Sequence, residues 1–117
     1  MHQQNDYNWY KLADSLQELT LSEGGLKEQQ VNGKKICVAL HNGTLYGCAA
    51  KCPHASGNLA DGYIDALGNI VCPIHRYKFS LQSGRNTSGE GYHLKQYPIQ
   101  MRADGIFIGF RADNIIG

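Results

Sequence analysis

The chain has 117 residues, which is the usual size of a single domain and leaves no room for a second catalytic module. Its formal net charge is +1, from 11 basic and 10 acidic residues, and the basic residues form no cluster, so we expect no binding to nucleic acid. No apolar stretch approaches 18 residues, so we also expect no membrane span.

The first residues, 1–6, lack the charged and apolar regions of a secretory signal, and this favours a cytoplasmic protein. The 14 glycines against 3 prolines predict many tight turns and no long helix. The single helix that we expect is short and covers Asp14–Leu19, with Asp14 as its N-cap.

Hairpin signals dominate the rest of the chain. The pairs Asn32-Gly33, Asn42-Gly43 and Asp104-Gly105 each predict a two-residue turn, because Asn, Asp and Gly tolerate a positive φ angle. They separate short, β-prone segments: Leu26–Val31, Lys34–Leu40, Thr44–Ala49, Tyr97–Arg102 and Ile106–Phe110. A further turn at 67–69 separates Gly62–Asp65 from Ile70–Cys72. The sequence therefore predicts an all-β fold, a small antiparallel sandwich or barrel with loops at one end.

Two of these loops each contain one cysteine and one histidine. Cys52 and His54 are separated by one residue, whereas Cys72 and His75 are separated by two. Thiolates and imidazoles in such short loops are metal ligands. Because each loop mixes the two residue types, the pattern differs from a zinc finger with two Cys in one loop and two His in the other.

This pattern resembles that of the Rieske [2Fe–2S] proteins, in which His replaces Cys on one of the two irons. The run from Cys72 to Gly84 is similar to the second loop and following strand of soluble Rieske ferredoxins, and Trp9–Ala13 is similar to their first strand. The resemblance covers roughly residues 8–110. It implies one [2Fe–2S] cluster per chain, with Cys52 and Cys72 on an inner iron, and His54 and His75 on an outer iron.

The same resemblance implies a single Rieske domain over residues 1–117, with a cluster-binding subdomain at about 48–80. It also implies a low reduction potential. High-potential Rieske proteins of respiratory chains carry a loop disulfide where this chain has Gly57 and Ile74, and hydroxyl donors where it has Tyr77 and Phe79. Fewer hydrogen-bond donors stabilise the reduced, more negative cluster less.

Three functions are compatible with these residues. The first is a ferredoxin, an electron carrier and not an enzyme by itself, that takes electrons from a flavin-dependent reductase and delivers them to a terminal oxygenase. The second is an accessory subunit similar to the small subunit of assimilatory nitrite reductase. The third, from another class, is a structural zinc-binding interaction module. The sequence names neither the redox partners nor the final substrate, and it leaves the oligomeric state open.

Two further cysteines belong to neither loop. The Asn42-Gly43 turn places Cys37 opposite Cys48, at a hydrogen-bonded position of the hairpin. A disulfide or a thiol sensor is one interpretation of this pair. The other, which a cytoplasmic location favours, is two small apolar residues in a β-sheet.

Overall fold

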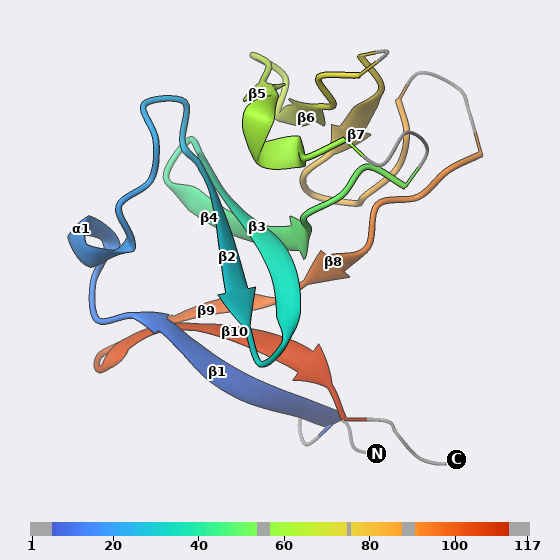
Figure 1. The fold of residues 1–117 in the computed structure, drawn as a ribbon. Helices are drawn as coiled ribbons and strands as arrows, with labels where there is room; N and C mark the ends of the chain where they lie inside the picture. The colour runs from blue at the N-terminus through green and yellow to red at the C-terminus, as the bar shows by residue number, and fades with distance from the viewer. Residues whose placement is uncertain (1–5, 54–56, 75, 88–90, 113–117) are drawn as a thin grey trace.

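Antiparallel strands make up most of the regular structure (Figure 1). The computed structural model describes residues 6–53, 57–74, 76–87 and 91–112. The elements in chain order are β1 (Tyr7–Ala13), α1 (Leu16–Leu19), β2 (Leu26–Val31), β3 (Lys34–His41), β4 (Thr44–Ala49), the 3₁₀ helix η2 (Leu59–Asp61), β5 (Tyr63–Ile64), β6 (Asn69–Val71), β7 (Lys78–Ser80), β8 (Gln96–Tyr97), β9 (Ile99–Arg102) and β10 (Gly105–Arg111).

The two Asn-Gly hairpins are confirmed. Both residues of each pair have positive φ angles, 49° and 82° at Asn32-Gly33, and 51° and 80° at Asn42-Gly43. These angles match the type I′ turn, whose twist suits two adjacent antiparallel strands. The turns join β2, β3 and β4, and β8 adds to the outer edge of β4.

Strand β3 lies in the middle of the molecule and is buried on both faces. Ile36 and Val38 belong to one apolar core, which lies between this sheet and the sheet of β1, β10 and β9. Cys37 and Ala39 point the other way, into a second core shared with the sheet of β5, β6 and β7. Because successive side chains of β3 point to opposite faces, this strand packs against both of the other sheets. The molecule therefore has three layers, which Figure 1 shows from bottom to top.

The C-terminal hairpin differs from the prediction in two respects. Tyr97 does not share a strand with residues 99–102, because it lies in β8 and pairs with Gly47 of β4. Pro98 separates the two strands, since proline has no N–H for a strand ladder. The turn residues are 103 and 104, because Gly105 already pairs with Arg102.

The predicted helix is present, but the prediction of Asp14 as its N-cap is wrong. The helix begins one residue after Ser15, whose hydroxyl oxygen accepts a hydrogen bond from the backbone N–H of Glu18 at 3.2 Å. The Glu18 carboxylate in turn accepts from the backbone N–H of Asp14 at 3.0 Å. The arrangement differs from a capping box only in that Glu18 accepts from the residue before the cap and not from the cap itself, so Asp14 lies just before the cap.

The third sheet is held by a turn built on Asp65. Its carboxylate accepts hydrogen bonds from the backbone N–H groups of Leu67 and Asn69, at 3.0 and 2.9 Å, and from the Asn69 side chain at 3.1 Å. Burial alone would raise the pKa of this carboxyl group. The bonds from Asn69 and Leu67 and the charge of Lys78 outweigh burial and hold the pKa below its usual value of 3.8.

Replacing Asp65 with alanine should therefore destabilise the protein by about 1–2 kcal/mol at neutral pH. Because the folded-state pKa is depressed, the carboxylate stabilises the fold above its unfolded-state value, and this contribution disappears as the pH falls below 3.8. Urea unfolding measured across the acid range should show the free energies of unfolding of the unsubstituted protein and of Asp65→Ala converging as the pH falls. The matched control is Asp61→Ala, at an exposed residue of η2. An Asp65→Ala effect no larger than that of the control would contradict this account of the turn.

The all-β antiparallel fold is thus confirmed, with one short α-helix among the described residues. No helix in the described part of the chain has the length and apolar character that crossing a membrane requires.

Candidate metal centre

Two loops of the same construction lie at the ends of β4 and β6. Each begins with a buried cysteine whose backbone N–H donates to a carbonyl five residues later: Cys52 to Gly57, and Cys72 to Tyr77, both at 2.8 Å. A proline follows each cysteine and restricts it to extended backbone geometry. The repeated closure gives two compact loops, each with its cysteine at the base.

The structure brings the two predicted cysteines together. Cys52 and Cys72 belong to the same core cluster, and each is at most 2% exposed. Their side chains also interact, since a hydrogen bond with Cys52 contributes to the shifted pKa of Cys72. The predictions for His54 and His75 lie outside the described residues. Within those residues, no cluster of three or more metal-ligating side chains is present.

Backbone N–H groups face the sulfur of Cys72. Burial raises the pKa of this thiol, as does neighbouring Cys52, whereas hydrogen bonds from the backbone of Ile74 and Gly57 act in the opposite direction. Such donors stabilise negative charge on sulfur. A thiolate bound to a metal would therefore find two donors already in place, one from each loop.

Gly57 is what allows the first loop to approach the second so closely. A Cβ atom at this position would lie 3.1 Å from Cys72 Sγ and 3.0 Å from the end of the Ile74 side chain. The sequence marked Gly57 as a position without a disulfide cysteine but gave no sign of this contact, which depends on how the loops face each other.

The backbone of Arg76 is a second feature that sequence reasoning missed. Its φ angle is 57°, in the left-handed region that non-glycine residues seldom adopt. Strain of this kind persists where the surrounding structure holds a loop in one shape. Arg76 lies in the second loop and directly follows His75 in the sequence.

Cys37 and Cys48 pair across β3 and β4 as predicted, and both are free thiols. They point into the same core as Cys52 and Cys72. A hydrogen bond with Cys37 and burial raise the pKa of Cys48 well above its usual value. A high thiol pKa disfavours the reactive thiolate, so the pair fits the interpretation as apolar sheet residues.

Comparison with known proteins gives one family. A model of the Rieske [2Fe–2S] domain matches residues 8–98. The ferredoxin component of a naphthalene 1,2-dioxygenase system from Pseudomonas aeruginosa is 24% identical over 99 residues, which cover 84% of this chain and 94% of the relative.

Two solved structures share the fold. The ferredoxin of carbazole 1,9a-dioxygenase from Nocardioides aromaticivorans IC177 superposes with a TM-score of 0.73 at 22% identity, covering 86% of this chain and 95% of that one. A chain assigned as the small subunit of an NADH-dependent nitrite reductase from Mycobacterium tuberculosis gives 0.77 at 18% identity, with coverages of 92% and 98%. At these identities, the likeness establishes the fold alone.

Proposed function

Because the chain belongs to the Rieske [2Fe–2S] domain family, we propose that it is a ferredoxin that passes single electrons from a flavin-dependent reductase to a terminal oxygenase. The observation that carries this proposal is the meeting of Cys52 and Cys72 at the base of two matching loops. The relation to a dioxygenase ferredoxin component supports an oxygenase as the electron acceptor. As part of the same proposal, the protein works in the cytoplasm.

The described residues fit a cluster of this type. Buried sulfurs from two loops adjoin each other, and backbone N–H groups of Gly57 and Ile74 are directed at one of them. Cys52 and Cys72 would hold one iron, and His54 and His75 the other. When bound, the cluster supplies a centre that accepts and releases one electron.

The protein would contribute the surroundings of that centre. The core under the loops includes Phe79 and Leu81, each at most 2% exposed, and it keeps water from the cysteine side. The cluster-binding subdomain at about 48–80 would consist of β5, β6 and β7 with the two loops. As an electron carrier, the chain would need a partner enzyme for any net reaction.

The surroundings of the loops predict a low midpoint potential. Rieske centres span about −150 to +300 mV, and hydrogen-bond donors near the sulfurs raise the value. Phe79 is fully buried beneath the loops and has no hydroxyl group to donate. We expect a midpoint below zero at pH 7 in a redox titration of the purified protein, followed by visible absorption. A midpoint well above zero would contradict this part of the proposal.

A nitrite reductase small subunit is the second candidate, favoured by the structural match over 92% of this chain. Affinity purification of the tagged chain from its own organism distinguishes the two. A carrier should release its partners on washing and exchange electrons with a separate oxygenase. A subunit should remain in a stoichiometric complex with a nitrite reductase chain, and that result would overturn the carrier proposal.

A further inference from the structure

Away from the cysteine loops, a hollow of about 260 Å³ lies where several strands begin or end. Three cationic side chains line it, and they come from well-separated parts of the sequence. Lys34 is the first residue of β3, Lys95 directly precedes β8, and Arg111 is the last residue of β10. The fold thus gathers three positive charges that are dispersed along the chain.

Each of these cations lies over an aromatic ring that also lines the hollow. Lys34 Nζ is 5.4 Å from the ring centroid of Phe110, Lys95 Nζ is 5.9 Å from that of Tyr97, and Arg111 Cζ is 6.0 Å from that of Tyr7. The rings hold the charged groups in place through their faces. Toward the other described residues, the three cations make no hydrogen bond or ion pair, so their N–H groups can meet a ligand.

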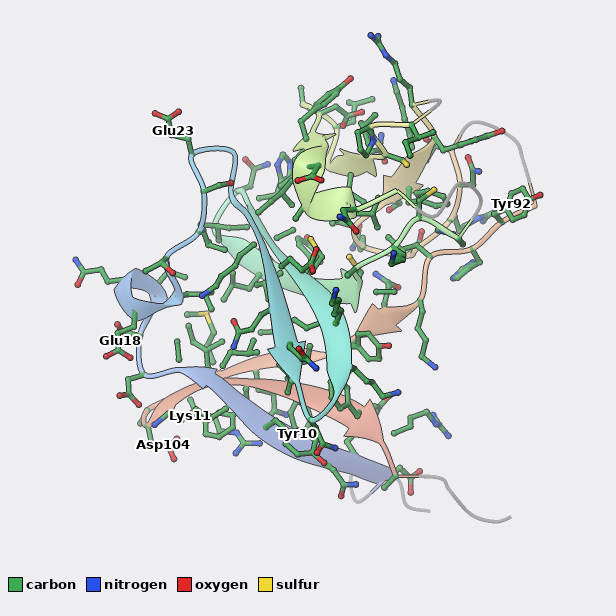
Figure 2. All side chains as sticks on the ribbon, in the orientation of Figure 1. Tyr10, Lys11, Glu18, Glu23, Tyr92 and Asp104 are labelled. Atoms are coloured by element: carbon green, nitrogen blue, oxygen red, sulfur yellow. The ribbon has the colours of Figure 1, made fainter. Side chains whose placement is uncertain are left out.

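No carboxylate of the described residues forms an ion pair with these cations. Among the described residues, the ion pairs are Lys11 with Asp14 and Lys78 with Asp65, and neither involves a cation of the hollow. Asp6, next to Tyr7 in sequence, is not among the lining residues. Figure 2 shows Lys11, Glu18 and Asp104 at the other end of β1, where the charges of both acidic residues act on Lys11. Three like charges without a counter-charge in the part of the chain that the structure describes favour binding of an anion.

A second hollow of about 340 Å³ shares Tyr7, Gln96 and Tyr97 with the first. It has no charged lining residue, and Leu45 and Ile99 contribute apolar surface. An uncharged aromatic hollow therefore adjoins a cationic one. Such a combination suits a ligand that has an apolar body and an anionic end.

We propose that these two hollows form a binding site for a small planar organic anion. Its carboxylate or similar oxyanion would pair with Lys34, Lys95 and Arg111, because charge-assisted hydrogen bonds are the strongest available there. Its ring would lie against Tyr7 and Tyr97, whose faces favour offset or edge contacts with another ring. The site uses no residue of either cysteine loop, so its existence does not depend on the proposed electron carrier role.

Titration of the oxidised, ¹⁵N-labelled holoprotein with sodium benzoate at constant ionic strength tests the proposal by NMR. Benzamide serves as the neutral ligand of the same shape, and inorganic phosphate as the anion without a ring. The variants are Lys34→Gln and Arg111→Gln. Lys35→Gln is the matched control, because it removes the same charge from the neighbouring residue, on the opposite face of β3.

Benzoate should cause saturable shifts in the backbone signals around Tyr97 and Phe110. Its affinity should fall about fivefold or more in Lys34→Gln and in Arg111→Gln, and should not change in Lys35→Gln. Benzamide should bind at least about fivefold more weakly than benzoate. The proposal is overturned by non-saturable shifts, by an equal loss in Lys35→Gln, or by phosphate binding as tightly as benzoate. If the anion-site proposal fails in one of these ways while the visible spectra of the variants stay unchanged, the cluster is intact and the electron carrier proposal is unaffected.

Discussion

Replacing Cys72 with serine should leave the purified protein almost without iron and without visible absorption. The side chain is fully buried, adjoins Cys52 and receives two backbone hydrogen bonds. The hydroxyl group of serine is a harder and much less acidic ligand than a thiol, so it should hold iron poorly at this position. Iron should fall from two atoms per chain to about a tenth of that content or less. Because a bound metal stabilises the folded state, the variant should also unfold at lower denaturant concentration.

The matched control is Cys37→Ala. Cys37 is equally buried and packs in the same core, but it lies in β3 and not in a loop. Its truncation should cost about 1 kcal/mol of stability while iron content and colour stay intact. Full iron content in Cys72→Ser, or loss of colour in Cys37→Ala, would contradict the assignment of the ligands. Iron and acid-labile sulfide assays together with absorption spectra provide the measurement.

Replacing Gly62 with alanine should produce the largest loss of stability of any glycine substitution in the described chain. A Cβ atom at Gly62 would lie 1.8 Å from the carbonyl oxygen of Val71, closer than any real contact allows. That carbonyl belongs to the residue directly before Cys72, within the ladder of β5, β6 and β7. Relief of the clash requires the backbone itself to move, so we expect a cost of about 3 kcal/mol or more.

Such a movement displaces the base of the second loop, and the variant should therefore also release iron faster on heating. Gly24→Ala is the control, since a Cβ there has its nearest neighbour, Ser22 Oγ, at 3.9 Å. Urea unfolding followed by circular dichroism gives the stability, and the decay of visible absorption gives the rate of cluster loss. A Gly62→Ala variant as stable as Gly24→Ala would show that β5 and β6 do not pack as described.

The parts of the fold that sequence reasoning predicted correctly are those set by local backbone chemistry. Asn32-Gly33 and Asn42-Gly43 tolerate the positive φ angles of a type I′ turn better than other residue pairs, so their hairpins followed from four residues. The prediction of one strand over 97–102 was wrong because the apolar pattern continues across Pro98. Only tertiary pairing decides that Tyr97 joins β4. The predicted turn at Asp104-Gly105 was wrong, because the register that places the turn at 103–104 depends on β10 meeting β9 and β1.

In the candidate site, too, some features were predicted from the sequence, whereas others depend on contacts between distant segments. The resemblance of the two loops to those of Rieske proteins implied that Cys52 and Cys72 would meet, and the structure places their side chains together. The close approach of Gly57 to Cys72 is a contact between two loops, which no local pattern encodes. The gathering of Lys34, Lys95 and Arg111 likewise arises only once the sheet of β1, β10 and β9 has packed against the sheet of β2, β3, β4 and β8, so a chain with a net charge of +1 carries a cationic hollow.

The central claim is that two cysteines and two histidines hold one [2Fe–2S] cluster, and nitrogen couplings in the reduced protein test it most directly. Electron–nuclear double resonance would be recorded on unlabelled protein and on protein in which histidine alone carries ¹⁵N. We predict strongly coupled nitrogens whose couplings change with the histidine label, and the loss of one of them in each of the variants His54→Cys and His75→Cys. A colourless protein that contains zinc, or an iron–sulfur signal without any histidine-dependent coupling, would contradict the account.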